Sequence, residues 1–259
     1  MYNGHALRKG LKTQLFGNKI YTFDTIDSTN NCARALASCW AEEGTVIIAE
    51  QQTAGRGRLG RMWQANPNEN LMFSIILRPE VSPETLNLMP LYVAVAVAEA
   101  VERVTKLEVE CKWPNDLLIN RKKFAGILLE GSVKQNAVEY VVIGIGVNVN
   151  QQSFAGELEH RATSLRLETH REVDRTALFR KILKSLEGHY NIVSSKGFQS
   201  ILPLWTSHSS MINKKISVSQ QGNVISGVVK GLSTEGGLIL QSEGSEKTLF
   251  AGDVTIVGM

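Results

Sequence analysis

The chain has 259 residues, of which 43% are hydrophobic and 20% charged, so its composition is that of a folded globular protein and not of a disordered one. Its 28 lysines and arginines against 25 aspartates and glutamates give a net charge of +3, which is too small an excess for nucleic-acid binding by the whole chain. The longest uninterrupted apolar run, Leu91 to Ala98, is too short to span a membrane, and no apolar core follows the basic N-terminal residues. We therefore predict neither a membrane segment nor a secretory signal.

The cysteines and histidines show no metal-binding or disulfide pattern. Cys32, Cys39 and Cys111 form no C-x-x-C spacing, and the five histidines form no H-E-x-x-H motif. An odd number of dispersed cysteines argues against a disulfide framework and against a cysteine-based zinc site. It is typical of a reducing compartment, so we expect a cytoplasmic protein.

Hydrophobic periodicity predicts the first regular elements after a polar, basic segment. Residues 1–19 have the composition of a leader or linker. A short strand is expected over 20–23, followed by a helix over 28–42 that Gly44 ends. The continuous apolar run 45–49 then predicts a buried strand.

The rest of the main domain is predicted to alternate between strands and apolar helices. Strands are expected at 71–77, 109–112, 117–119, 124–129 and 140–147. A long Ala/Val/Leu-rich helix is expected over 83–104, and two further helices over 174–194 and 198–205. We assign these elements to one domain over 20–210.

The texture of the sequence changes near Met211. Short strands separated by Gly, Ser and Asn turns are predicted at 215–218, 224–230, 238–240, 248–250 and 254–257. This spacing is typical of a small antiparallel barrel or sandwich of about 48 residues. Because such a module is marginally stable alone, we expect a second domain over 211–259 that packs against the first.

The strongest local motif is a loop over 53–63 that combines arginine with glycine. Arg56, Arg58 and Arg61 alternate with three glycines, and no acidic residue stands between them. Glycine lets backbone N–H groups approach a ligand closely, and arginine binds carboxylate or phosphate through a planar fork. The pattern therefore predicts a loop that wraps an anionic group, against the alternative of a solvated basic turn.

The same loop satisfies G-x-G-x-x-G, but neither protein class that uses this motif fits. The dinucleotide fingerprint requires the glycines to open a helix directly after a strand, whereas Arg61 to Asn68 is a poor helix start. The kinase version requires a valine where Met62 stands, together with an H-R-D motif that the sequence lacks.

Four further segments carry chemically useful residues, each with a plainer alternative. Lys112–Asp116 ends a strand with groups that suit a nucleotide or metal, or it is ordinary turn chemistry. Lys123 enters an apolar strand, where it can hold an anion, or it is an exposed turn residue. Glycines in the strand segment 144–148 indicate close approach by a ligand or plain packing. Segment 27–30 precedes a helix, where Ser28 or Thr29 caps it or binds a ligand with the N-terminal amides.

Together and in this order, these segments resemble biotin–protein ligases, the enzymes that attach biotin to a lysine of a carrier domain. The match runs from about Tyr21 to Val257. It joins D-S-T-N (27–30), Q-x-A-G-R-G-R-x-G-R-x-W (52–63), K-W-P-N-D (112–116), K-x-A-G-I-L-x-E (123–130) and G-x-G-x-N (144–148). The resemblance implies an α+β fold: a mixed β-sheet flanked by helices, related to class II aminoacyl-tRNA synthetases, followed by a small SH3-like β-barrel.

The resemblance also implies a role for each matched residue. The ring system and ureido group of biotin would contact Ser28, Thr29, Asn30 and Gln52. Biotin's carboxylate and the adenylate phosphate would be wrapped by Arg56, Gly57 and Arg58, and the reacting carboxylate and α-phosphate would contact Lys123. The pocket would be lined by Trp63, Gly126, Gly144 and Gly146. Candidate ATP-binding residues are Arg56, Arg58, Arg61, Lys112, Asn115 and Asn148, and candidate catalytic residues are Lys123, Arg56 and Arg58.

The reaction implied by the resemblance consumes biotin and MgATP, forms biotinyl-5′-adenylate and transfers biotin to a carrier lysine. The partner would be a biotin carboxyl carrier protein or domain of acetyl-CoA carboxylase or a related carboxylase. Metal ligands cannot be identified from the sequence, because ATP phosphates can supply most of them. Asp27 lies too near the N-terminus for a preceding helix-turn-helix domain, so we expect no specific DNA binding. The sequence does not distinguish between a monomer and a homodimer.

Two other functions are compatible with part of the pattern. A lipoate–protein ligase would have a related fold but uses an R-R-x-S-G-G-G type of loop, which is absent here. A protein that only senses biotin or an adenylate would keep the same binding loops. Retention of both arginines and Lys123 favours a catalyst.

Overall fold

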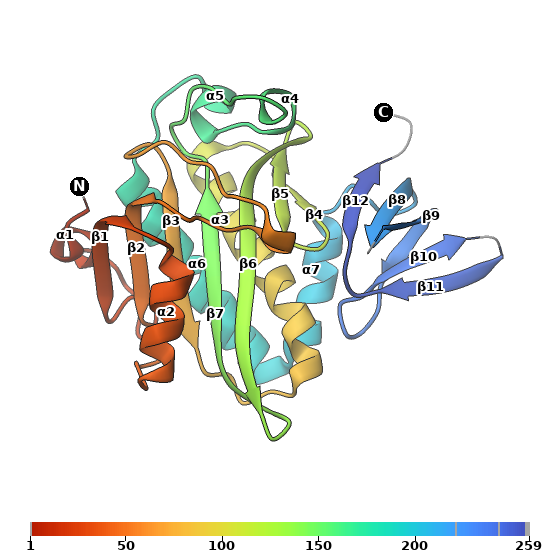
Figure 1. Cartoon of the computed structure of the whole chain (residues 1–259), viewed down its shortest axis with the longest axis horizontal. Coiled ribbons are helices and arrows are strands. Elements are labelled where there is room, and N and C mark those ends of the chain that lie inside the picture. Colours follow the sequence, from red (N-terminus) through yellow and green to blue (C-terminus); the bar gives the residue numbers. More distant parts are fainter. Residues whose placement is uncertain (1, 221, 243, 257–259) are drawn as a thin grey trace.

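The computed structural model describes residues 2–220, 222–242 and 244–256 and shows two domains joined side by side (Figure 1). The larger domain is built on a seven-stranded mixed sheet in the order β1-β2-β3-β7-β6-β5-β4. Its strands are β1 (Ile20–Ile26), β2 (Val46–Gln52), β3 (Leu71–Leu77), β4 (Glu110–Lys112), β5 (Asp116–Ile119), β6 (Lys122–Lys134) and β7 (Ala137–Val147). The β1–β2 pair is parallel and the other pairs are antiparallel.

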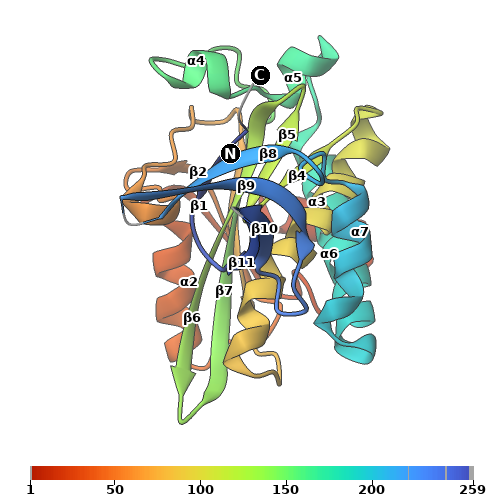
Figure 2. The same ribbon diagram turned by 90° about the vertical axis from the view of Figure 1, so that its right-hand side faces the viewer.

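Helices cover both faces of this sheet, as Figure 2 shows. On one face lies α2 (Thr29–Ser38), whose Ala33 and Ala37 pack on Ile47, Ile76 and Val142. On the other face lie α3 (Met89–Thr105), α6 (Arg175–Lys196) and α7 (Leu202–Ser207). Alternate strand residues face the two layers, which accounts for the apolar character of β3, where Ser74 is the one polar residue.

The core of the larger domain is centred on α3. Residues from Met89 to Ala98 are nearly all buried, and Tyr92 donates a hydrogen bond to Leu186 O in α6 at 2.8 Å. The continuous helix Pro83–Thr105 is long and apolar enough by composition to cross a membrane, yet 67% of its most apolar window is buried inside the protein. Its apolar residues therefore pack in the core between the sheet and α6. The first turns, Pro83–Leu88, are a 3-10 helix (η2), so the α-helix begins later than predicted.

The first nineteen residues differ from the predicted leader or linker. They contain helix α1 (Gly4–Arg8), and the side chains of Leu7 and Phe16 are buried in the core. The backbone N–H groups of Gln14, Leu15 and Phe16 donate to the Glu187 carboxylate in α6 at 2.6–2.8 Å. The composition of residues 1–19 could not predict this packing, because the segment is held by the carboxylate of Glu187, which lies far away in the sequence.

Two other boundaries differ from the sequence prediction. Helix α2 ends at Ser38 and not near residue 42, because Trp40 adopts a left-handed conformation with φ 59°. The hairpin β6–β7 is longer at its tip than predicted and turns at Gln135 and Asn136, which both have positive φ. Besides α1, three short helical segments were not predicted: α4 (Leu158–Arg161), α5 (Leu165–Thr169) and the 3-10 turn η1 (Arg58–Gly60). The predicted helix 198–205 is a 3-10 turn, η3 (Phe198–Ile201), followed by α7.

The smaller domain is a five-stranded antiparallel sheet that confirms the β-rich module predicted after Met211. Its strands are β8 (Lys215–Gln220), β9 (Asn223–Leu232), β10 (Leu238–Ser242), β11 (Ser245–Leu249) and β12 (Asp253–Ile256), in the order β11-β10-β9-β8-β12. The last strand thus pairs with the first, as in an SH3-like barrel. The predicted last strand was placed one residue further, and Val257 lies outside the described residues.

Candidate active site

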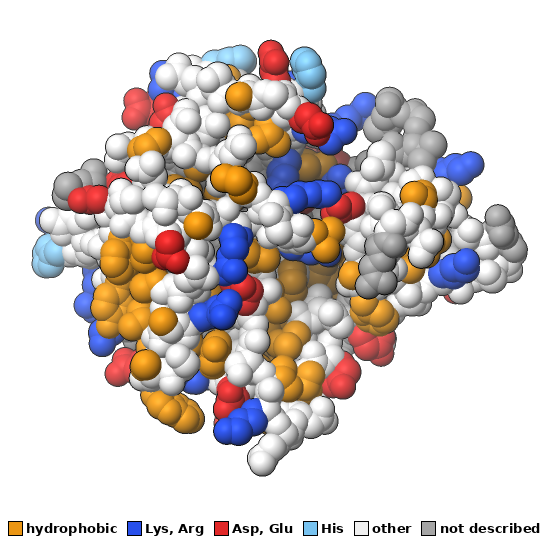
Figure 3. Space-filling model, in the orientation of Figure 1, with side chains coloured by type: hydrophobic (Ala, Val, Ile, Leu, Met, Phe, Trp, Pro, Cys, Tyr) orange, Lys and Arg blue, Asp and Glu red, His pale blue; other side chains and the backbone are white. Residues whose placement is uncertain are grey.

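One cavity of about 390 Å³ gathers the motifs of the sequence analysis into a single site. It opens near the junction of the two domains, where Figure 3 shows a hollow with lysine and arginine side chains. Every predicted site residue except Lys112 lines it: Ser28, Thr29, Asn30, Gln52, Arg56, Gly57, Arg58, Arg61, Trp63, Asn115, Lys123, Gly126, Gly144, Gly146 and Asn148. The residues come from α2, β2, the 53–63 loop, β6, β7 and the turns beside them.

Glycines in β7 make room for the side chains that shape this cavity. A Cβ atom at Gly144 would stand 2.3 Å from Asn30 Oδ1, and one at Gly146 would stand 2.5 Å from Trp63 Cε2. A Cβ at Gly126 in β6 would lie 3.1 Å from both Lys123 and Trp63. The predicted close approach at these glycines is therefore made by cavity-lining side chains.

One end of the cavity is a buried polar cluster at the start of α2. Gln52 Oε1 accepts from Thr29 N at 2.7 Å and from Thr29 Oγ1 at 3.1 Å. Ser74 Oγ lies 2.8 Å from Thr29 Oγ1 and 2.6 Å from Asn30 Oδ1. Ser28 stands at the N-cap position, but its side chain makes no capping hydrogen bond, so capping does not explain why a hydroxyl lines the cavity there.

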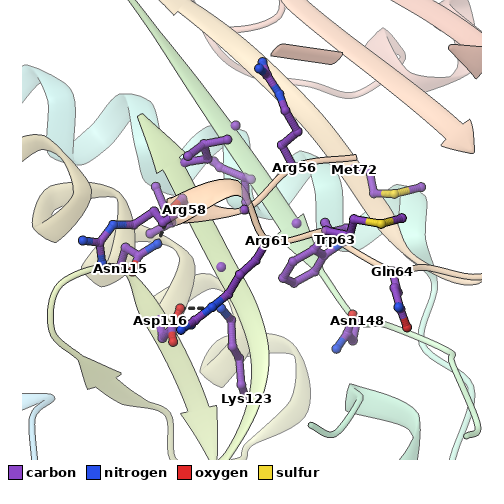
Figure 4. A pocket seen from close by; sticks show the side chains of 18 of the residues that line it. Arg56, Arg58, Arg61, Trp63, Gln64, Met72, Asn115, Asp116, Lys123 and Asn148 are labelled. Atoms are coloured by element: carbon purple, nitrogen blue, oxygen red, sulfur yellow. Dashed lines mark hydrogen bonds and ion pairs between the residues drawn. The ribbon is translucent and has the colours of Figure 1, made fainter. Parts of the chain in front are cut away.

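Lys123 provides a positive charge on the opposite side. Its Nζ lies 2.5 Å from Asp116 Oδ1 and 5.7 Å from the ring centroid of Trp63. The side chain is 35% exposed, so Lys123 is a partly enclosed cavity residue and not the exposed turn residue of the plainer alternative. Figure 4 shows this ion pair below the 53–63 loop.

A loop that wraps an anion would be expected to direct its arginines to one point. The three loop arginines instead contact different partners. Arg58 donates to Asn115 Oδ1 at 3.2 Å and to Gly252 O at 3.5 Å. Arg61 pairs with the Asp253 carboxylate of the smaller domain. Burial lowers the pKa of the Arg58 guanidinium, an effect that the nearby carboxylates of Asp253 and Asp116 oppose.

Arg56 points away from Lys123 and Asp116 in Figure 4. It donates to Asn31 Oδ1 at 2.7 Å and to both oxygens of Glu130 at 3.2 Å. Its guanidinium thus ties the loop to α2 and β6. In this structure Arg56 and Arg58 hold the loop at two different places, while Arg61 holds it at a third.

Three buried polar atoms of cavity-lining residues have no hydrogen-bond partner among the described residues. One of them, Asp116 Oδ1, is ion-paired with Lys123. The other two are Trp63 Nε1, a donor, and Asn148 Oδ1, an acceptor. The other end of the Asn148 amide donates to Thr163 O at 3.0 Å, which fixes the amide's orientation. Because a buried unpaired polar group costs about 1–3 kcal/mol, Trp63 Nε1 and Asn148 Oδ1 are suited to meeting polar groups of a ligand.

Lys112 is the one predicted residue that does not line the cavity. It pairs in register with Asp116 across the β4–β5 hairpin. Burial lowers the pKa of its ammonium group, and the Asp116 carboxylate opposes this shift.

Sequence reasoning assigned no role to several residues that the structure places in the site. They are Met62, Gln64, Met72, Phe73, Asp116, Ile127, Leu128, Ile145, Phe154, Glu157, Leu158, Arg161, Ala162 and Asp253. Asp116 belongs to the K-W-P-N-D motif, so the sequence offered a signal from which it could have been predicted as a site residue. Asp253 gave no local signal, because it reaches the site only through the packing of the two domains. In the described part of the chain, no group of three or more His, Cys, Asp or Glu side chains is placed to hold a metal ion.

Both domains match families of known proteins. Residues 22–148 match the model of the Biotin/lipoate A/B protein ligase family, and residues 211–257 match the Biotin protein ligase C terminal domain. The bifunctional ligase/repressor BirA of Bacillus subtilis is 36% identical over 252 residues, which cover 96% of this chain and 78% of the relative. The biotin–[acetyl-CoA-carboxylase] ligase of Paracoccus denitrificans is 31% identical, covering 90% of this chain and 98% of the relative.

A solved structure shows the same fold. The biotin protein ligase from Aquifex aeolicus in complex with biotin and ATP superposes with a TM-score of 0.78 at 29% identity, covering 92% of this chain and 98% of that one. Two domain models and relatives at 31–36% identity thus agree on the family, and the solved structure agrees with the fold. The chain belongs to the biotin protein ligase family.

Proposed function

We infer that the chain is an ATP-dependent biotin protein ligase. One observation carries this inference: a single cavity joins a neutral hydrogen-bonding end at Thr29 and Gln52 to a cationic end at Lys123, Arg58 and Arg61. Biotin has the matching form, with a neutral cyclic urea at one end and a carboxylate at the other. The relatives named as biotin–[acetyl-CoA-carboxylase] ligases support the same activity.

In the first step, a carboxylate oxygen of biotin attacks the α-phosphorus of ATP. A new O–P bond forms, the bond to the β-phosphate breaks, and pyrophosphate leaves. The reaction brings two anions together, and the ammonium of Lys123 offsets their repulsion. Because Lys123 is already paired with Asp116 at 2.5 Å, its charge is held in place before the substrates arrive, as electrostatic catalysis requires.

In the second step, the ε-amine of a carrier lysine attacks the acyl carbon of the mixed anhydride. An amide bond forms, the bond to AMP breaks, and the amine releases a proton to solvent. Until the carrier arrives, the adenylate must be shielded from water. The 53–63 loop is placed for this role, because its arginines are tied to β6 and to the smaller domain.

We assign the sequence-predicted residues to the two substrates on this basis. Ser28, Thr29, Asn30 and Gln52 would hold the urea end of biotin, and Trp63, Gly126, Gly144 and Gly146 would shape its pocket. Arg56, Gly57 and Arg58 would meet the carboxylate and α-phosphate after Arg56 exchanges its present partner, Glu130. Asn115, Asn148 and Arg61 would face the nucleotide, with Lys112 acting through Asp116.

The partner implied by the relatives' names is the biotin carrier protein or domain of a carboxylase. We propose Mg²⁺ bound chiefly through ATP phosphates and water. We also propose a cytoplasmic monomer or homodimer without operator binding. A gel shift with operator-specific retention at physiological salt would contradict the last point.

The activity is tested by ATP–pyrophosphate exchange. Exchange that depends on biotin is the expected result, and a biotinylated carrier domain should follow when the apo-carrier is added. Exchange with lipoate in place of biotin would identify a lipoate ligase. Tight biotin binding without any exchange would identify a sensor.

Gly146→Ala is expected to lower kcat/KM for biotin by about 10²-fold, because the new methyl group would overlap the Trp63 ring and displace it into the cavity. The measurement is initial-rate adenylation over a range of biotin concentrations. Gly131→Ala in β6 is the matched control, since its nearest non-neighbouring atom would be 3.3 Å away at Tyr140 O. Equal kinetics for the two variants would contradict the proposed place of Trp63.

A further inference from the structure

The tip of the 53–63 loop carries apolar side chains that the folded chain leaves uncovered. The loop is a narrow hairpin, in which Arg56 and Met62 pair as an antiparallel bridge and the 3-10 turn Arg58–Gly60 forms the tip. Leu59, in the middle of this turn, is 71% exposed, and Met62 is 70% exposed. Two large apolar residues that stand three positions apart are therefore both in contact with water.

The backbone at Leu59 is unusual for a leucine. Its φ of 56° and ψ of 34° place it in the left-handed conformation, which a Cβ atom makes unfavourable and which glycine or asparagine adopts more readily. The leucine gains no burial in return, because it is exposed and does not line the cavity. Packing within the chain therefore gives no reason for an apolar residue at the tip, whereas contact with a partner does.

The tip stands at the rim of the cavity. Arg58 and Arg61, on either side of the turn, both line the cavity, and Met62 does so too. Figure 4 shows the loop above the ion pair of Lys123 and Asp116. Because both arginines are bound to the smaller domain, the tip is held in place before any partner arrives.

The second step of the proposed reaction determines what must meet this rim. The acyl carbon of the adenylate would lie inside the cavity, near Lys123, and the ε-amine of the carrier lysine has to reach it. A lysine side chain has only four methylene groups, so the surface of the carrier around its lysine must come against the rim. Apolar side chains on that surface would remove Leu59 and Met62 from water, which favours association.

We propose that Leu59 and Met62 form a docking patch for the apo-carrier, where they contact apolar side chains beside its acceptor lysine. This proposal rests on the proposed function, since the carrier is the second substrate of that reaction. The patch serves recognition of the carrier and not formation of the adenylate, because biotin and ATP bind inside the cavity, which Leu59 does not line.

Leu59→Asn tests the proposal, since asparagine is polar and tolerates the left-handed backbone of the turn. We expect the KM for the apo-carrier domain of acetyl-CoA carboxylase to rise about tenfold, which corresponds to about 1.4 kcal/mol. Biotin-dependent ATP–pyrophosphate exchange needs no carrier and should change less than about twofold.

Hydroxylamine provides a second measurement on the same variant. It attacks the acyl carbon of the adenylate as the carrier amine does, forming biotinyl hydroxamate and releasing AMP. Because it is too small to touch the rim while it reacts, its rate with Leu59→Asn should stay within about twofold of wild type.

Met62→Gln is a second variant of the patch, and Ile192→Gln is the matched control. Met62 also lines the cavity, so its effect is read as the ratio of kcat/KM for the carrier to kcat/KM for hydroxylamine, which should fall about tenfold. Ile192 is 42% exposed but lies on α6, on the face of the sheet opposite to α2. Its replacement should leave all three rates unchanged.

The other outcomes would assign the patch differently. An unchanged KM for the carrier in Leu59→Asn would overturn the proposal. An equal fall in exchange and in carrier transfer would also overturn it, because Leu59 would then act on the geometry of the loop. A change from dimer to monomer in sedimentation, with the carrier KM unaltered, would make a second copy of the chain the partner. The proposed function itself fails only if the wild-type protein shows no biotin-dependent exchange.

Discussion

Lys123→Ala is expected to lower kcat for biotin adenylation by about 10²–10³-fold while leaving the Kd for biotin within about threefold of wild type. Removing one preorganised charge from a site where negative charge develops has this effect in other enzymes. The neutral end of biotin would still bind at Thr29 and Gln52, 2.7 Å apart through their hydrogen bond, so affinity is largely retained. Single-turnover formation of the adenylate and calorimetric titration with biotin give the two numbers.

Lys122→Ala is the matched control for this experiment. Lys122 is the neighbour of Lys123 in β6, but its side chain is exposed and does not line the cavity. Its removal takes away the same charge without altering the site, so adenylation should continue at the wild-type rate. Loss of biotin affinity with normal turnover in Lys123→Ala would make Lys123 a binding residue only.

Arg175→Ala is expected to reduce the free energy of unfolding by about 3–5 kcal/mol. Arg175 Nη1 donates to Glu50 Oε2 at 2.6 Å, to Asn70 O at 3.0 Å and to the Tyr2 hydroxyl oxygen at 2.7 Å. The side chain of Glu50 is only 4% exposed, so its charge would lose its guanidinium partner in a poorly solvated place. Urea unfolding followed by circular dichroism measures the change.

Arg103→Ala gives the comparison. Arg103 also forms an ion pair, with Glu99 at 2.8 Å on α3, but its side chain is 67% exposed. Water screens such a pair, so the loss should be below about 1 kcal/mol. The double variant Glu50→Gln/Arg175→Met should recover part of the loss, because it removes the charge of the buried carboxylate together with the charge of the guanidinium. Similar unfolding energies for the Arg175 and Arg103 variants would show that the buried pair contributes little.

The elements that could be predicted from the sequence are those in which every residue has the same degree of burial, because their hydrophobic pattern is then uniform. Strand β3 matches its prediction, 71–77, because all of its residues are buried. Helix α2 was predicted too long because the positive φ of Trp40 has no signature in the sequence. The packing of Phe16 escaped prediction because it depends on Glu187, 171 residues away.

The same distinction applies to the site. Residues in contiguous motifs, such as Thr29 and Lys123, were predicted because each motif carries its own chemistry, and the structure brings them into one cavity. Asp253 was missed because nothing near it in the sequence resembles a ligand site. The outward direction of Arg56 was also missed, since it follows from its ion pair with Glu130, which lies in β6, 74 residues further along the chain.

The tether between the 53–63 loop and the smaller domain has a consequence for how the protein can be altered. Arg61 is bound to Asp253 and Arg58 to Gly252 O, so a domain remote from the biotin end forms part of the catalytic wall. The two folding units therefore cannot be exchanged freely between ligases: a chimera would keep both β-sheets intact yet leave the arginine loop without its anchor. Such a hybrid should regain turnover when the aspartate at the start of the last strand is restored.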